Sequence, residues 1–310
     1  MRRLRRIVVL CATLGLSTSC DGRGRLSVPP AGDSSVRVPD ADPGVTGNDA
    51  NFIDEAPGVR LRGLSDGQRD VFFSIINTES SACDEPHSLA QSLRDDEACH
   101  DSKVAAQFIA DAIAAGASTA DIRHDVAVIV ATLKPKRIDI GGRPVYGRAH
   151  APVTVVVFAD FECPHCRLEA PRLRKAIDRS NGKARLVFKH FPLGHHEVAK
   201  RAAVATEIAH RAGKFWAMHD AVFANQHRLT EPLLSELAAN IGLDEQKFAT
   251  AMQASTGKDI VESDHREGTR LGVLGTPTVY VDGRKVNDVL FGGTVEGWID
   301  DAIQRHTKAQ

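Results

Sequence analysis

Apolar residues recur at helical spacing from residue 67 to about residue 135. Side chains three and four positions apart lie on one face of a helix, so each repeat predicts a helix with one buried face. Gly116 ends one of these helices and Ser118 begins the next. The stretch predicts a small all-α module of roughly three or four helices. Its apolar positions are Val71, Phe72, Ile75, Ile76, Val104, Phe108, Ile109, Ile113, Ile122, Val126, Ile129 and Val130.

Residues 137–310 carry a different pattern, in which short apolar runs alternate with longer helical stretches. A continuous apolar run of strand length is typical of a strand buried on both faces. The pattern predicts an α/β fold with a sheet of roughly four or five strands, interrupted by a helical insertion at about 195–271. Strands are expected near 138–140, at 153–158, at 186–189, at 278–281 and near 286–291, with a hairpin turn at Asp282-Gly283.

The first twenty residues have the pattern of an export signal. Arginines at positions 2, 3, 5 and 6 precede an apolar run at 7–16, which is too short to span a bilayer. The segment before Cys20 resembles a bacterial lipoprotein signal, although Ser17 stands where that pattern usually has leucine. We therefore expect residues 1–20 to direct export and Cys20 to carry lipid. Ordinary signal cleavage and an uncleaved anchor are the alternatives.

Residues 21–66 are rich in Gly, Pro, Asp, Ser and Arg and have no hydrophobic periodicity. Such a segment buries too little apolar surface to offset the entropy lost on ordering. We expect a disordered tether, which would hold the folded part away from a membrane if Cys20 is lipidated.

The charge balance argues against nucleic acid as a partner. The chain has 39 basic and 40 acidic residues, a formal net charge of −1 and 5% aromatic residues. A strongly basic surface and aromatic stacking platforms are therefore not expected.

The number of cysteines fits an oxidising compartment. Of six cysteines, Cys11 lies in the signal and Cys20 is the lipid carrier. The remaining four allow three pairings, and an even remainder suits two disulfides. A local pair between Cys163 and Cys166 leaves Cys83–Cys99, a structural disulfide that would contribute about 3 kcal/mol.

The strongest chemical signal is Cys163-Pro164-His165-Cys166, directly behind the apolar run at 153–158. Two thiols three positions apart, where a strand gives way to a helix, can close a redox-active disulfide. The amides at the helix N-terminus favour a thiolate at the first sulfur. Half of a zinc site looks the same, but a second Cys-x-x-Cys pair is absent from the sequence. No metal and no cofactor are therefore expected.

Further motifs strengthen this interpretation. Phe191-Pro192-Leu193, the run 213–216 (Gly-Lys-Phe-Trp) and the run 271–277, which ends in Gly275-Thr276-Pro277, accompany the cysteine motif. Together they resemble the DsbA-like thioredoxin family of exported thiol–disulfide oxidoreductases. The resemblance implies a thioredoxin fold with an inserted helical domain over residues 137–310. It also implies that Pro277 is a cis-proline, which presents the backbone of Thr276 to an incoming polypeptide.

The same resemblance implies a role for each residue of the motif. Cys163 is the attacking sulfur that forms the mixed disulfide, and Cys166 is the more buried resolving thiol. His165 stabilises the Cys163 thiolate and so makes the disulfide more oxidising. Pro164 constrains the first helical turn. The implied partners are exported proteins with cysteines and a membrane redox protein that reoxidises the dithiol.

Two departures leave the direction of electron flow open. Family members have a buried acid six positions before the first cysteine, where this chain has Val157; Asp160 or Glu162 could substitute. Thr276 is frequent in thiol isomerases, whereas strong oxidases often have valine there. The leading hypothesis is an oxidase of the cell envelope. A reductase or isomerase is the alternative within enzymes, and a non-catalytic binding lipoprotein is the alternative outside them.

Other prominent residues are expected to be structural. His195 and His196 are interpreted as a solvated helix end, since no ligand set of metal-binding spacing accompanies them. Phe215 and Trp216 are interpreted as core residues of the inserted helices.

Overall fold

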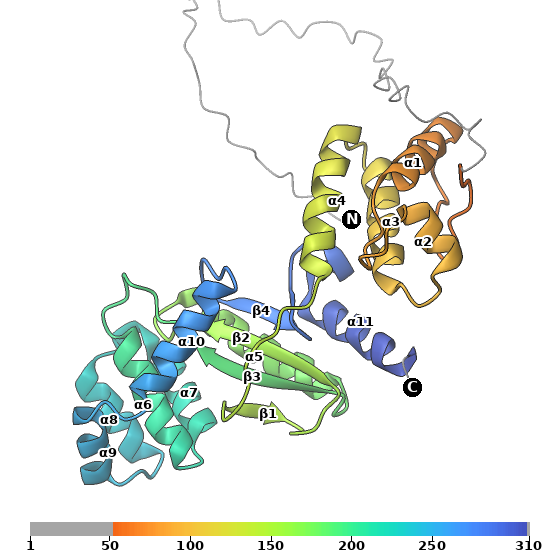
Figure 1. Cartoon of the computed structure of the whole chain (residues 1–310). Coiled ribbons are helices and arrows are strands. Elements are labelled where there is room, and N and C mark those ends of the chain that lie inside the picture. Colours follow the sequence, from red (N-terminus) through yellow and green to blue (C-terminus); the bar gives the residue numbers. More distant parts are fainter. Residues whose placement is uncertain (1–51, 309–310) are drawn as a thin grey trace, which may run out of the picture. The chain divides into compact units, whose positions relative to one another are not determined.

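The computed structural model describes residues 52–308, and the predicted signal, Cys20 and most of the predicted tether lie outside this range. A five-stranded mixed sheet forms the centre of the C-terminal part (Figure 1). Its spatial order is β1-β3-β2-β4-β5, in which β2 and β3 are parallel and the other pairs are antiparallel. The strands are β1 (Val145–Gly147), β2 (Val153–Ala159), β3 (Ala184–His190), β4 (Thr278–Val281) and β5 (Arg284–Lys285).

Alternating residues of β2 build a core on each face of the sheet. Val155 and Val157 belong to the core that includes residues of α5 (Pro164–Arg179) and α11 (Val295–Lys308). Val156 and Phe158 belong to a second core on the opposite face. This period of two follows from the pleat of a strand, and because both faces are covered, the whole run is apolar.

The helical insertion lies between β3 and β4 in the chain, as the sequence predicted. Its helices are α6 (Ala199–Arg211), α7 (Phe215–Ala224), α8 (Glu231–Asn240), α9 (Glu245–Gln253) and α10 (Lys258–Arg270), with a 3-10 turn at Gln226–Arg228. Gly268 of α10 lies against the second face, since a Cβ atom there would come within 2.6 Å of Phe191 and 3.1 Å of Phe158. Because α10 ends at Arg270, the segment 271–277 follows it directly.

Among the described residues, four helices precede the sheet: α1 (Asp66–Thr78), α2 (Leu89–Asp95), α3 (His100–Ala114) and α4 (Thr119–Leu133). They surround a core of their own, to which Ile53 and Leu64 also belong. The predicted tether extended to residue 66, but Ile53 is 8% and Leu64 is 7% exposed. Both residues are isolated apolar positions outside any helical periodicity, so the sequence pattern did not predict their burial. The packed part therefore begins earlier than predicted. Among residues 52–308, we find no helix long and apolar enough to cross a lipid bilayer.

Two predicted strands are wrong. Residues 138–140 form no strand: the Asp139 amide donates to Glu267, and its carbonyl accepts from Lys189, so side chains replace a neighbouring strand. The last strand ends at Lys285, because the Asn287 side chain accepts the amides of residues 289 and 290 and forms a turn. The hairpin turn at Asp282-Gly283 is present, with φ of 47° and 78°.

The structure joins Cys83 to Cys99, the pairing that elimination left. Cys99 directly precedes α3, and Asp101 in the first turn of that helix receives a bidentate ion pair from Arg284 at 2.7 and 2.8 Å. The disulfide therefore holds the start of the helix that supplies this carboxylate.

We expect the double variant Cys83→Ala/Cys99→Ala to lose about 3 kcal/mol of unfolding free energy, because the disulfide restricts the unfolded chain. Denaturant unfolding followed by circular dichroism measures the change. The Cys163→Ala/Cys166→Ala background confines the effect of added reductant to this disulfide. In that background, reductant should lower the unfolding free energy of the protein that retains Cys83 and Cys99 to that of the quadruple variant. Equal unfolding free energies of these two proteins without reductant would contradict the expectation.

Candidate active site

The dithiol lies where β2 gives way to α5. Cys163 is the N-cap residue of α5 and Pro164 occupies its first turn, which needs no amide donor. Cys163 is 7% and Cys166 is 2% exposed, and both are free thiols. Pro164 and His165 are exposed between them. The amides of the first turn of α5 stabilise negative charge on the Cys163 sulfur.

The segment after α10 brings Thr276 to Cys163. The Thr276–Pro277 peptide bond is cis, as the resemblance implied. The Cys163 thiol donates a hydrogen bond to the Thr276 carbonyl oxygen at 3.1 Å. Two residues 113 positions apart in the chain therefore meet at one sulfur. The structure thus brings together the cysteine motif and the Thr276-Pro277 motif.

Cys166 lies behind Cys163 in the interior. Burial raises the pKa of the Cys166 thiol to about 12, although its sulfur accepts a hydrogen bond from the Asp160 amide at 3.4 Å. A thiol with so high a pKa is a poor nucleophile and a poor leaving group near neutral pH. The two cysteines are therefore chemically unequal, with Cys163 the sulfur closer to solvent.

Gln226, in the turn after α7, is a site residue that the sequence did not reveal. Its amide Nε2 donates to the carbonyl oxygens of Phe161 at 2.8 Å and Cys163 at 3.0 Å. It thereby fixes the backbone on which the first cysteine stands. A single polar residue in a turn belongs to no sequence pattern that would predict contacts with residues 63 and 65 positions away.

Asp160 and Glu162, the two expected substitutes for a buried acid, hold loops instead. The Asp160 carboxylate accepts from the Glu162 amide at 2.7 Å, the Leu193 amide at 2.6 Å and His196 Nδ1 at 2.8 Å. The Glu162 carboxylate accepts from the Val198 amide at 2.7 Å, just before α6. Both carboxylates thus have their hydrogen-bond partners in loops next to the cysteine motif, and within the described residues neither is hydrogen-bonded to the Cys166 sulfur.

The interpretation of His196 as part of a solvated helix end is wrong, because its ring is paired with buried Asp160. His195 is exposed, as expected. Phe215 is 3% exposed and Trp216 packs against the same core, which agrees with the structural interpretation of this pair.

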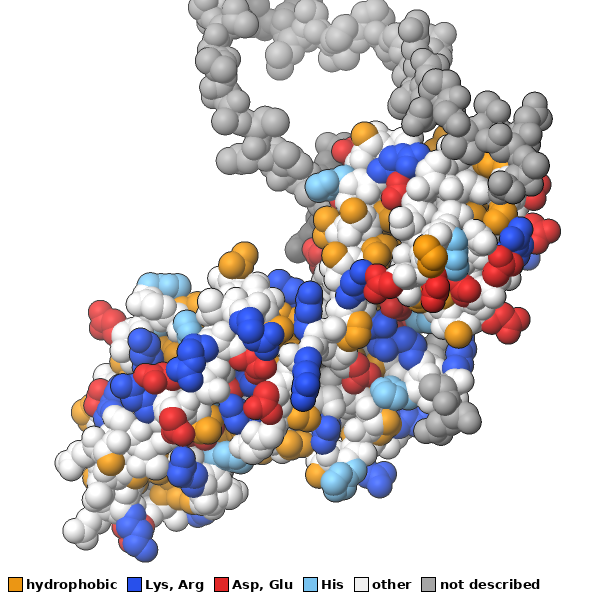
Figure 2. Space-filling view, in the orientation of Figure 1, with side chains coloured by type: hydrophobic (Ala, Val, Ile, Leu, Met, Phe, Trp, Pro, Cys, Tyr) orange, Lys and Arg blue, Asp and Glu red, His pale blue; other side chains and the backbone are white. Residues whose placement is uncertain are grey.

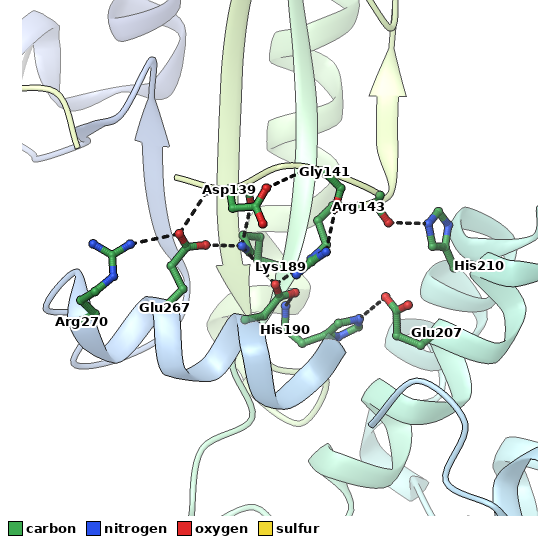
Figure 3. Close-up of polar contacts among 11 residues, drawn as sticks. Asp139, Gly141, Arg143, Lys189, His190, Glu207, His210, Glu267 and Arg270 are labelled. Atoms are coloured by element: carbon green, nitrogen blue, oxygen red, sulfur yellow. Dashed lines mark hydrogen bonds and ion pairs between the residues drawn. The ribbon is translucent and has the colours of Figure 1, made fainter. Parts of the chain in front are cut away.

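Buried ion pairs and hydrogen bonds join α10 to β3 (Figure 3). Asp264 is fully buried and accepts from Arg143 Nε at 2.7 Å, Lys189 Nζ at 3.1 Å and the His190 amide at 3.1 Å. Lys189 also pairs with Glu267. Because β3 lies parallel to β2, both strands finish at the same end of the sheet, and Cys163 comes soon after β2 at that end. The network therefore positions α10, and with it the Thr276-Pro277 segment, against the dithiol.

The surface drawn in Figure 2 mixes Lys and Arg with Asp and Glu side chains, in keeping with the near-zero net charge. Two of the few large apolar side chains that are exposed belong to segments of the site. Leu168 of α5 is 56% exposed, and Leu274, two residues before Thr276, is 95% exposed. In residues 52–308, no group of three or more His, Cys, Asp or Glu side chains is placed to hold a metal ion.

Comparisons with known proteins agree with this geometry. The family model described as thioredoxin matches residues 139–301. A probable disulfide bond formation protein D of Bacillus cereus is 34% identical over 155 residues, which are 46% of this chain and 70% of that protein. The crystal structure of oxidised BdbD from Bacillus subtilis is similar at 26% identity and a TM-score of 0.50, over 55% of this chain and 97% of that one.

Other relatives are much longer proteins. The Na(+)/H(+) antiporter NhaA 3 of Salinispora tropica is 38% identical over 143 residues, which are 46% of this chain but 22% of the antiporter. The chain therefore spans about a quarter or less of the length of such relatives, and the similarity does not extend to an antiporter as a whole. Together with the site, the comparisons show that the chain belongs to the thioredoxin family and is related to the disulfide bond formation protein D of Bacillus cereus.

Proposed function

We propose that this protein is an exported thiol–disulfide oxidoreductase that works mainly as an oxidase of other proteins. A substrate thiolate attacks the Cys163 sulfur of the Cys163–Cys166 disulfide and forms a mixed disulfide, while the Cys166 sulfur leaves and takes up a proton. A second substrate thiolate then attacks the mixed disulfide at the substrate sulfur. The substrate leaves with a new disulfide, and Cys163 leaves as a thiolate; two electrons have passed to the protein.

The observation that carries the proposal is the pairing of Cys163 with the Thr276 carbonyl beside cis-Pro277, with Cys166 buried behind. An extended substrate that binds along the Thr276 backbone would bring its own sulfur to Cys163. The amides of α5 would stabilise the thiolate that Cys163 becomes as a leaving group. Exposed His165 would add to this stabilisation when protonated.

The remaining parts of the proposal concern place and partners. We propose that the protein works in the cell envelope, anchored by lipid on Cys20. A membrane redox partner, linked to quinones, would reoxidise the dithiol. Its substrates would be exported proteins with reduced cysteines, because stable disulfides form in that compartment.

Two measurements on the purified protein test the oxidase. It should oxidise a reduced, unfolded model protein, and Cys163→Ala should reduce the rate to background. The reduction potential of the dithiol should lie above about −200 mV, on the oxidising side of typical reductases. A potential near about −270 mV would favour the reductase. Equal oxidation rates with and without Cys163 would favour a non-catalytic binding protein.

A further inference from the structure

Cys166 must take up or release one proton in every round of disulfide exchange. Its thiol is 2% exposed, and burial raises its pKa to about 12. Without a nearby proton carrier, its departure as a bare thiolate is unfavourable, and so is its attack as a thiol. Val157 supplies no acid, and Asp160 and Glu162 are engaged in the loops. A different group is therefore needed for the proton.

A small cavity adjoins Cys166 in the interior. Its volume is about 10 Å³, and its lining includes Cys166, Val157, Pro277 and Trp216. This space holds about one water molecule, for which Cys166, Glu169 and His219 are the polar partners in an otherwise apolar lining. Besides Cys166, the ionisable side chains that line it are His219 of α7 and Glu169 of α5. The cavity therefore offers a route for a proton between Cys166 and one of these two groups.

The hydrogen bonds of His219 define which ring nitrogen is free. Nδ1 lies 2.8 Å from a carboxylate oxygen of Asp220, and because an ionised carboxylate only accepts, Nδ1 carries the hydrogen. Arg174 holds the same carboxylate at 2.7 Å, and its Nη2 also lies 3.3 Å from Nδ1. A guanidinium only donates, so the two contacts call for opposite roles of Nδ1, and the shorter one, to Asp220, makes Nδ1 the donor. Within the described part of the chain, no hydrogen bond to Nε2 is found. Nε2 is therefore the acceptor of this ring, which lines the cavity.

The surroundings also fix the charge of the ring. His219 is 3% exposed, and burial lowers its pKa, helped by the nearby guanidinium of Arg174, while Asp220 opposes the change. The ring is therefore neutral near pH 7 and can accept a proton. Glu169 is more accessible, at 25% of its side chain, and pairs with Arg172 at 3.6 Å. The buried, oriented imidazole is the stronger candidate, since a carboxylate is a weaker base than an imidazole.

We propose that His219, oriented by Asp220, exchanges a proton with Cys166 across this cavity through one water molecule. When Cys166 attacks a mixed disulfide on Cys163, its proton passes to Nε2, the Cys163–Cys166 bond forms, and the former partner leaves as a thiolate. In the opposite direction the imidazolium returns the proton to the departing Cys166 sulfur. The step needs no outside oxidant, because the sulfur of the leaving partner takes up the electrons.

This inference rests on the proposed function, but it can be tested on the dithiol alone. Reduced protein mixed with 5,5′-dithiobis(2-nitrobenzoate) releases one coloured thiolate when Cys163 attacks and a second when Cys166 resolves the mixed disulfide. Stopped-flow absorbance measures the second phase from about pH 5 to about pH 10. In the parent, its rate should rise through the His219 pKa and then level off, as expected for a general base.

In His219→Phe, the second phase should be at least about tenfold slower near neutral pH. It should then rise about tenfold per pH unit, because only the Cys166 thiolate fraction reacts. The first phase should be unchanged. His265→Phe is the matched control: burial also lowers the pKa of this histidine, but its ring stacks on Phe191 outside the cavity, so both phases should match the parent.

Asp220→Asn provides a second variant in case His219→Phe does not fold, because the Asp220 side chain is 54% exposed. Loss of the carboxylate should slow the second phase and move its inflection to lower pH. An unchanged pH profile in both variants would overturn the proposal. So would a change of profile in Glu169→Gln alone, which would assign the proton to Glu169. Failure to oxidise protein substrates, with these profiles intact, would count against the proposed function and not against His219.

Discussion

Replacing Cys166 with alanine should trap substrate proteins as mixed disulfides on Cys163. The Cys163 thiolate still attacks a substrate disulfide, forms the new S–S bond and releases the other substrate sulfur as a thiolate. The intramolecular attack that frees the substrate can no longer occur, so adducts accumulate and turnover falls to background. Non-reducing gel electrophoresis and mass spectrometry, with an oxidised peptide as substrate, measure the adduct.

The matched control is Cys163→Ala, which leaves Cys166 as the remaining thiol of the motif. Because Cys166 is 2% exposed and its pKa is raised to about 12, this variant should form almost no adduct near neutral pH. The asymmetry between the two variants is the test. Equal trapping by both would mean that Cys166 is as accessible and as reactive as Cys163, against the geometry of the site.

The residues that carry the chemistry were predictable because local sequence positions them. A cysteine at the junction of an apolar strand and a helix becomes the N-cap residue of that helix wherever the strand lies in a sheet. The Gly275-Thr276-Pro277 run was predictable only through the family resemblance. Its contact with Cys163 crosses 113 residues, and no local preference encodes such a contact.

The two strand predictions were wrong where side chains, in place of a neighbouring strand, form hydrogen bonds with the backbone. Ile138 and Ile140 have the composition of a strand, but Lys189 and Glu267 bind the backbone of Asp139 between them. Nothing in a short apolar run distinguishes a strand from an extended segment that ion-pairing side chains hold in place. The same holds for residues 286–291, where the Asn287 side chain competes with the sheet.

The buried charges of α10 were hidden for a related reason. Charged residues are numerous along this helix, so its sequence resembles a solvated surface. A clue was available in β3, where Lys189 follows Leu186, Val187 and Phe188 in an otherwise apolar run. A lysine that is 1% exposed requires a carboxylate nearby, and the fold supplies Asp264 and Glu267. Which of the many acids would do so depends on the packing of α10.

Asp264→Asn should therefore lower the free energy of unfolding by about 3–5 kcal/mol, because it leaves buried cations without a full counter-charge. The substitution keeps the shape of the side chain but removes the charge that Arg143 and Lys189 share at 2.7 and 3.1 Å. The NH2 group of an asparagine would also face the donors that surround Asp264, where the carboxylate oxygen accepted from them. Urea unfolding followed by circular dichroism measures the loss.

Glu262→Gln is the matched control on the same helix. Its side chain is 52% exposed and pairs with Lys258 at 3.4 Å, so the same loss of one charge should cost no more than about 0.5 kcal/mol. A small effect at both positions would mean that the network contributes little to stability. A large loss at Asp264 alone should also slow oxidation of protein substrates, because α10 leads into the segment that places Thr276 at Cys163. The buried charges would then act on the chemistry through the position of that segment.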